Sequence, residues 1–85
     1  MEYKIAIAQQ LSSILKNKRK LAGLTQEDMG KKLGISQRVF ARNEAHPEKV
    51  NFERILQILS ELDADLVIRE RNSYEKTNRP DEESW

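Results

Sequence analysis

The sequence lacks cysteine altogether and has only two prolines and three glycines among its 85 residues. The absence of cysteine excludes disulfides, thiolate metal sites and nucleophilic cysteine chemistry, and it favours a reducing cytoplasm as the compartment. No run of 18 or more apolar residues occurs. The N-terminal stretch MEYKIAIAQQL also lacks the basic start and continuous apolar segment of a signal peptide. We therefore expect one small cytoplasmic domain with no membrane association.

Histidine is also scarce, since His46 is the only one and stands beside Pro47 in a polar loop. A metal site needs several converging ligands, so a role in shaping the loop or lying near a phosphate is the better interpretation. The serines have no histidine partner in their sequence context. We expect no metal, no cofactor and no catalysis.

The net charge of +1 hides an uneven distribution of charge along the chain. Residues 1–45 contain nine Lys and Arg against four acidic residues, a balance of +5, whereas residues 46–85 contain six against ten, a balance of −4. The basic half is the part to suspect of meeting a polyanion, although a solvated, lysine-rich helix surface would have the same composition.

Apolar spacing and capping signals predict four helices. The expected spans are residues 5–22, 26–33, 37–45 and 52–62. Thr25 opens the sequence TQED, in which a Thr and an acid three residues later satisfy the free N–H groups of a helix start reciprocally. Asn51 can cap the fourth helix. The apolar stripe predicted for that helix consists of Phe52, Ile55, Leu56, Leu59 and Leu62.

Only three residues separate the second and third predicted helices. Gly34 can take the left-handed conformation that ends a helix, Ile35 supplies an apolar plug, and Ser36 caps the next helix. Gly30 costs about 1 kcal/mol of helix propensity relative to Ala. We therefore expect it to mark the place where the two helices approach most closely.

This turn predicts a helix-turn-helix, whose second helix enters the major groove of DNA. Helical spacing places Gln37, Arg38, Ala41 and Arg42 on one face of that helix. Gln can bond adenine and Arg can bond guanine through two hydrogen bonds, each pair contributing about 1–3 kcal/mol of discrimination, and Ala can contact a thymine methyl. The remaining candidates for the DNA contact lie at the helix starts and are Thr25, Gln26 and Ser36.

Residues 64–71, ADLVIRER, read as a short strand with alternating character toward its end. A lone strand leaves its backbone unpaired, and we find no other strand candidate in the sequence. A second copy of the chain is the simplest partner, so we predict a homodimer. The strand residues expected to pair are Leu66, Val67, Ile68 and Arg69.

The stretch GLTQEDMGKKLGISQRVFARNE resembles the Xre-type helix-turn-helix of phage repressors and bacterial regulators. The similarity continues through HPEKVNFERILQILSELDADLVIRER, which resembles HipB-type antitoxins, and covers roughly residues 5–71. It implies a lambda-repressor-like fold of four to five helices with a C-terminal strand that pairs across a homodimer. It also implies an operator-binding autorepressor that neutralises a HipA-like serine/threonine kinase toxin.

The resemblance further implies roles for individual residues. Gln26 would contact phosphate, and Gln37, Arg38 and Arg42 would read bases. Arg19 and Glu44 match positions that form an internal ion pair in the phage-repressor relatives, so Arg19 is not assigned to the DNA contact.

Two residues depart from the family pattern. Asn43 occupies a slot usually filled by a large apolar residue. Asp63 replaces the glycine that usually precedes the strand.

Residues 72–84 are polar and are predicted to be disordered, so the domain is assigned to residues 1–71 and a flexible tail to 72–85. Trp85 ends that tail. It is interpreted as a frayed end, as a tether that inserts into a pocket of the toxin, or as a side chain packed on its own domain.

Two other functions remain open. A stand-alone phage-like repressor would have no toxin partner. An interaction adaptor would keep the fold without binding DNA, and would lack the steep loss of DNA affinity with added salt.

Overall fold

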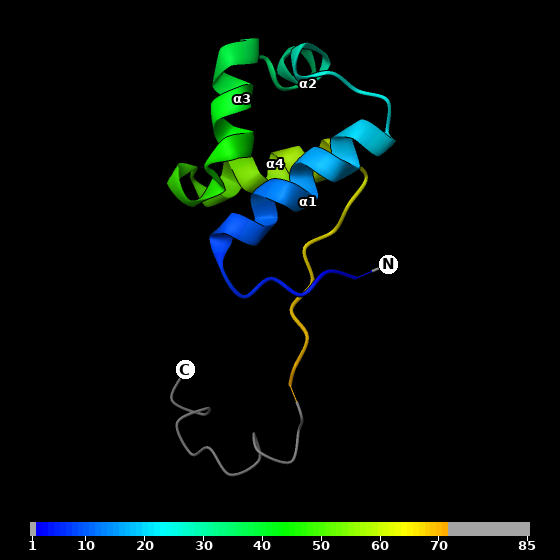
Figure 1. Cartoon of the computed structure of the whole chain (residues 1–85), viewed down its shortest axis with the longest axis vertical. Helices are drawn as coiled ribbons and strands as arrows, with labels where there is room; N and C mark the ends of the chain where they lie inside the picture. The colour runs from blue at the N-terminus through cyan, green and yellow to red at the C-terminus, as the bar shows by residue number, and fades with distance from the viewer. Residues whose placement is uncertain (1, 72–85) are drawn as a thin grey trace.

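The computed structural model of the chain describes residues 2–71, which form helices joined by short loops (Figure 1). In chain order the elements are α1 (Ala8–Leu21), α2 (Gln26–Leu33), α3 (Gln37–Ala45), a short 3-10 helix η1 (Pro47–Lys49) and α4 (Phe52–Glu61). In Figure 1, α2 lies across the top of the molecule and α3 stands at one side, above α1 and α4. The predicted mainly α fold with a helix-turn-helix is therefore confirmed. The predicted tail, with Trp85, lies outside the described residues.

The core draws one fully buried side chain from each α-helix. These are Leu15, Met29, Phe40 and Ile58. Burial of a side chain of this size contributes about 1.5–3 kcal/mol, so the four helices hold one another in fixed positions. α3 is thereby anchored to the body through Phe40, and its opposite face is free to point outward.

The first helix is shorter than the sequence predicts. It begins at Ala8 and not near Ile5, because Ile7 is extended (φ −135°, ψ 154°). The side-chain oxygen of Gln10 accepts hydrogen bonds from the amides of Ala6 and Ile7 at 2.6 and 3.0 Å, which stabilises this late start. Leu21 ends the helix and is 76% exposed.

The stripe predicted for α4 is only partly correct. Ile55, Leu59 and the C-terminal Leu62 are buried, but Phe52 and Leu56 are 63% and 41% exposed. The fully buried Ile58, which the predicted stripe omitted, takes their place in the core. The buried face of α4 is thus rotated away from Phe52 and Leu56, and these two side chains remain on the surface.

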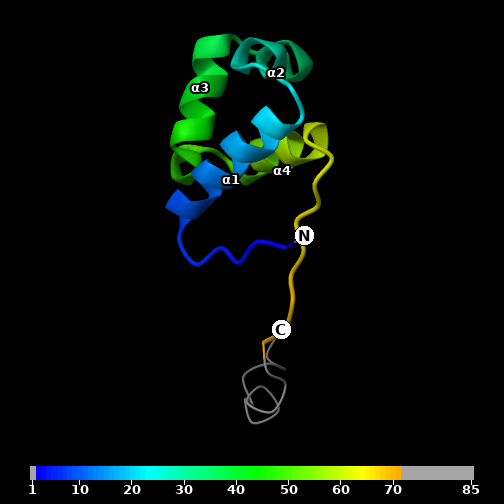
Figure 2. The same cartoon turned by 45° about the vertical axis from the view of Figure 1, so that its right-hand side comes forward.

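Residues 64–71 run as an extended chain, but no β-strand is formed within residues 2–71. Asp63 starts the segment in the left-handed conformation (φ 58°), at the position where the family pattern has glycine. The extended N-terminal residues lie close to this segment in both views (Figures 1 and 2), and Glu2 accepts a hydrogen bond from Arg69 at 2.6 Å. Pairing of the segment with a second copy therefore stays a prediction.

Candidate nucleic-acid interface

The corner between α2 and α3 is built around two glycines. Gly34 has φ 73° and ends α2, and the amide of Ile35 donates to the carbonyl oxygen of Gly30 at 2.9 Å. A Cβ at position 30 would lie 2.7 Å from the carbonyl oxygen of Ile35, closer than van der Waals contact allows. The turn thus packs directly on α2, which sets the direction in which α3 leaves.

α3 presents a polar face to the solvent, as its sequence predicts. Gln37, Arg38 and Arg42 are exposed, whereas Phe40 is fully buried on the other side of the helix. Ala41 lies on the same helix and is half-buried, which reduces the access of its methyl group to a thymine methyl. The exposed amide and the two guanidinium groups share one face and can reach the same partner.

Both helix starts next to this face carry side-chain caps. The hydroxyl oxygen of Thr25 accepts from the amide of Asp28 at 3.0 Å, and that of Ser36 accepts from the amide of Val39 at 3.1 Å. The Ser36 hydroxyl keeps its own proton, which can be donated to a phosphate oxygen, whereas the Thr25 hydroxyl also hydrogen-bonds the Asp28 carboxyl. Capping and phosphate contact are therefore compatible at Ser36, and the assignment of Thr25 to the phosphate contact stays a prediction.

Asp28 completes the cap of α2. Its carboxylate accepts from the amide of Thr25 at 2.9 Å. This hydrogen bond, that of the Thr25 hydroxyl and the charges of Lys31 and Lys32 hold the pKa of the Asp28 carboxyl below its usual value. The carboxylate therefore remains ionised at the helix start, where negative charge is stabilising.

A buried ion pair supports α3 from beneath. Arg19 donates through Nε to Oε2 of Glu44 at 2.7 Å and through Nη2 to Oε1 at 3.2 Å. The Arg19 side chain is 9% exposed, so it points into the protein and does not face DNA.

Gln26 joins this network, which the sequence did not predict. Its amide nitrogen donates to Oε1 of Glu44 at 3.0 Å, and the residue is half-buried. One of its two amide protons is thus committed to the interior, leaving the other for a phosphate. The assignment of Gln26 to the DNA contact stays a prediction.

Asn43 on α3 has a buried polar atom that forms no hydrogen bond within the described chain. Its side-chain oxygen is buried and has no hydrogen-bond partner among the described residues. An apolar residue there would need no partner, so the departure from the family pattern has a physical cost.

His46 follows α3 in the loop that leads to η1. Its Nδ1 lies 3.2 Å from Oε2 of the exposed Glu48. A hydrogen bond from the backbone amide of Glu48 itself holds the pKa of the Glu48 carboxyl below its usual value, and the contact with His46 and the charge of Lys49 add to this effect. Among residues 2–71 no group of three His, Cys, Asp or Glu side chains is arranged to hold a metal ion.

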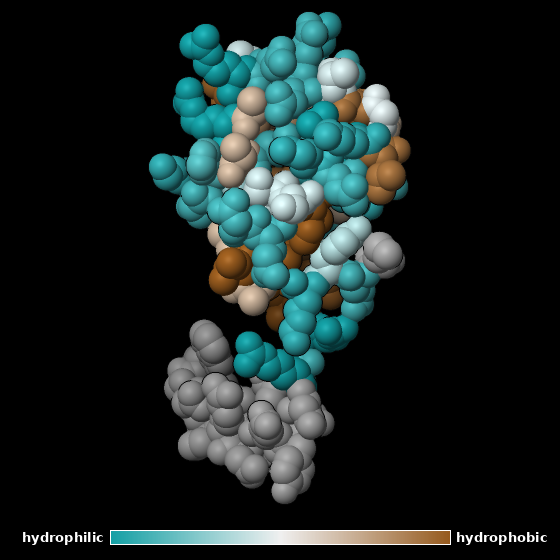
Figure 3. All heavy atoms as spheres, in the orientation of Figure 1, coloured by the Kyte–Doolittle hydropathy of each residue, from teal (hydrophilic) through white to brown (hydrophobic). Residues whose placement is uncertain are grey.

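The residues predicted to dimerise lie far from α3, on the opposite end of the molecule (Figure 1). Leu66, Val67 and Ile68 are 48%, 72% and 94% exposed. In the space-filling view, hydrophilic residues cover most of the part around α2 and α3, and apolar residues appear at the upper right-hand edge and lower down, near the extended segments (Figure 3). Tyr3, Ile5 and Ile7 form an alternating apolar row in the N-terminal segment that is also exposed and that the sequence did not predict.

None of the helices between residues 2 and 71 is long and apolar enough to span a membrane. Residues 2–71 present a polar surface with the exposed arginines of α3 and, apart from it, an apolar surface beside α4.

Comparison with solved structures places the chain beside HipB. It matches a HipB chain from a HipB-O1-O2 complex with a TM-score of 0.73 and 28% identity, covering 81% of this chain and 100% of that one. It matches a HipB variant in complex with an O2 20mer with a TM-score of 0.75 and 26% identity, covering 85% and 100%. The match to a chain in the HipA-HipB-O2-O3 complex has a TM-score of 0.74 and 27% identity, covering 84% and 100%.

No curated protein matches the sequence. A protein family described as helix-turn-helix matches residues 15–67, which include all of the corner, α3 and α4. The geometry of the corner and this match agree, and the chain belongs to the helix-turn-helix family.

Proposed function

We propose that this protein is a DNA-binding transcriptional repressor that acts as the antitoxin of a HipA-like serine/threonine kinase toxin. The observation that carries the DNA-binding part is the corner at Gly34, which leaves Gln37, Arg38 and Arg42 exposed on a helix anchored through Phe40. The helix-turn-helix family and the similarity to HipB chains solved with O1 and O2 support the same function.

In this mechanism a homodimer presents two copies of α3 to successive major grooves of a roughly palindromic operator. Gln37, Arg38 and Arg42 read base edges, with Ala41 beside them, and the starts of α2 and α3 contact phosphates through Thr25, Gln26 and Ser36. Occupation of the promoter excludes RNA polymerase. The protein works in the cytoplasm by binding alone, without catalysing a reaction and without a cofactor.

The antitoxin part is supported by the similarity to a HipB chain solved together with HipA. We propose that outer surfaces of the domain, and Trp85 at the end of the chain, hold the kinase in an inactive assembly.

A stand-alone repressor is the alternative, and purification after co-expression with the neighbouring gene separates the two. Co-purification of a kinase with the full-length chain, weakened when Trp85 is removed, supports the antitoxin. A neighbour that is no kinase, or that fails to co-purify, favours the stand-alone repressor.

The DNA-binding part is tested by gel shifts with the chain's own promoter at increasing salt. Binding through several phosphates predicts a steep linear fall of log affinity with log salt, with a slope of about −0.9 per neutralised phosphate. No binding to this DNA, or affinity independent of salt, would favour the interaction adaptor and contradict the proposal.

A further inference from the structure

The extended segment after α4 carries charges that are symmetric about Val67. Asp65 precedes Val67 by two residues and Arg69 follows it by two, while Asp63 and Arg71 stand four residues away on either side. Two identical strands that pair antiparallel about a two-fold axis at Val67 would place each of these acids directly opposite an arginine of the other copy. The segment is thus complementary to itself.

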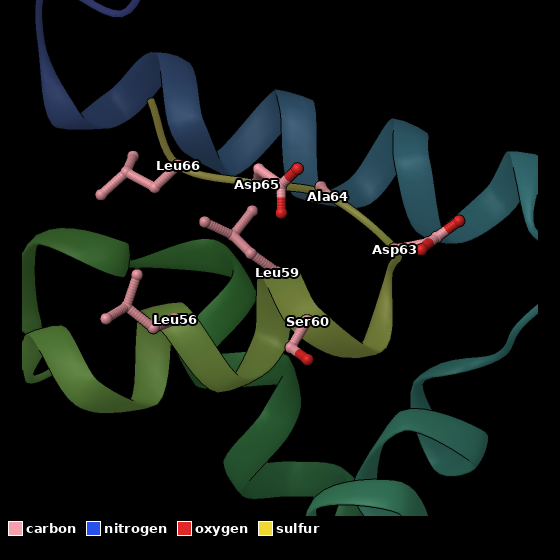
Figure 4. A pocket seen from close by; sticks show the side chains of 7 residues that line it. All are labelled: Leu56, Leu59, Ser60, Asp63, Ala64, Asp65 and Leu66. Atoms are coloured by element: carbon pink, nitrogen blue, oxygen red, sulfur yellow. The ribbon is translucent and has the colours of Figure 1, made fainter. Parts of the chain in front are cut away.

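The two faces of the segment are chemically distinct in the same register. Alternation puts Asp65, Val67 and Arg69 on one face and Leu66 and Ile68 on the other. Leu66 lines an open groove with Leu56 and Leu59 of α4, and Asp65 lines the same groove beside it (Figure 4). Asp65 and Leu66 thus both lie at the groove, and both remain exposed.

Ile68 is an apolar side chain that its own protomer leaves uncovered and that a second copy could cover. It is 94% exposed and does not line the groove of its own protomer, whereas Leu66 does. In the pairing centred on Val67, Ile68 lies opposite Leu66 of the other copy and would reach the groove formed by that copy's α4. Each protomer thus covers the apolar side chain that the other leaves exposed.

The backbone of the segment is free to pair. Ala64 donates its amide to the carbonyl oxygen of Leu59 at 2.9 Å, but residues 65–71 form no backbone hydrogen bond within the described chain. The contact of Arg69 with Glu2 joins side chains that are 68% and 77% exposed, so it is weakly held. Asp65 forms no ion pair with any residue between 2 and 71.

We propose that a second copy of the chain pairs antiparallel with this segment in the register centred on Val67, and that Asp65 and Arg69 select this register and this partner. The inference rests on the dimer of the proposed function and adds the residues that specify it. If the two-fold axis passed through residue 66 or 68, only one acid in each segment would lie opposite an arginine of the other copy. If the axis passed between two residues, the charged face of one strand would lie on the same side of the pair as the apolar face of the other.

The test uses charge reversal in the full-length chain and sedimentation equilibrium at low salt. Asp65→Arg alone and Arg69→Asp alone each place like charges opposite each other twice in the dimer, and each should raise the dimer Kd at least about tenfold. Combining the two substitutions in one chain exchanges the charges and should return the Kd to within about threefold of wild type. An equimolar mixture of the two single variants should form a heterodimer.

Glu70→Arg is the matched control, because it makes the same change in charge in the same segment at a position opposite Ala64 of the other copy. It should leave the dimer Kd within about threefold of wild type. If both single reversals dimerise as wild type does, if the exchanged chain fails to recover, or if wild type is a monomer, the inference is wrong. Gel shifts of wild type with promoter DNA report the proposed function separately. Wild type can bind DNA while charge reversal has no effect on the dimer Kd, and charge reversal can raise the dimer Kd of a protein that binds no DNA.

Discussion

Arg19 on α1 and Glu44 on α3 meet inside the protein, with Nε of Arg19 2.7 Å from Oε2 of Glu44 and their side chains 9% and 1% exposed. Nη1 of Arg19 also donates to the carbonyl oxygen of Leu24 at 2.9 Å. The pair therefore connects α1 to the loop before α2 and to the end of α3, the helix proposed to read the DNA bases.

Glu44→Gln should lower the free energy of unfolding by about 3–5 kcal/mol, because it leaves the Arg19 charge buried without its counter-charge. Urea denaturation of purified protein measures this loss. The double variant Arg19→Met/Glu44→Leu removes both charges and should be more stable than Glu44→Gln. A loss below about 1 kcal/mol in the single variant would show that the pair is effectively solvated.

Gly30→Ala should destabilise the protein even though Ala favours helices by about 1 kcal/mol. The added Cβ would meet the carbonyl oxygen of Ile35 at 2.7 Å, and this atom belongs to the backbone of the turn. We expect a net loss of about 1–3 kcal/mol in urea denaturation. Lys32→Ala, at an exposed position of the same helix, is the control and should change stability by less than about 0.5 kcal/mol. Stabilisation by Gly30→Ala would mean that the turn does not pack on α2 as described.

Asn43→Leu should stabilise the protein. The substitution removes a buried oxygen that has no partner in the described chain, and relief of such a group is worth about 1–3 kcal/mol. Thermal unfolding measures the gain. Asn17→Leu makes the same change at an exposed position of α1 and should gain only a few tenths of a kcal/mol from helix propensity. Equal gains from the two variants would contradict a specific cost at Asn43.

Asp28 should make stability depend on pH. Its pKa is lowered in the folded protein, chiefly by the backbone amide of Thr25, so its ionised form favours folding above the ordinary pKa of 3.8. This contribution is lost as pH falls from about 5 through the lowered pKa of the folded state. Asp28→Asn should therefore flatten the dependence of the urea midpoint on pH in that range. Parallel curves for wild type and variant would rule out the contribution.

The sequence predicted those parts of the fold whose chemistry is local. Thr25, Ser36 and Asn51 cap the helices to which they were assigned, and Gly34 ends α2 in the left-handed conformation. Each of these signals depends on residues only two or three positions apart, so no knowledge of tertiary packing was needed.

Features that depend on distant residues were predicted less well. Gln26 lies 18 residues from its partner Glu44, and no spacing rule relates them. Phe52 and Leu56 fit an apolar stripe, yet the core turns a different face of α4 inward and selects Ile58. Periodicity shows that a helix has an apolar side, whereas the three-dimensional packing decides which apolar residues the core includes.

Selection of bound sequences from a pool of random DNA duplexes shows whether Gln37 and Arg38 read the operator. Wild type should enrich a roughly palindromic sequence, and Gln37→Ala/Arg38→Ala should fold normally by circular dichroism but lose at least about tenfold of that preference. Arg54→Ala/Gln57→Ala removes the same residue types from α4, where they contact each other at 3.0 Å, and should retain the preference. If the Gln37 and Arg38 variant enriches the same sequence as strongly as wild type, these residues do not read the bases and the proposed base contacts are wrong.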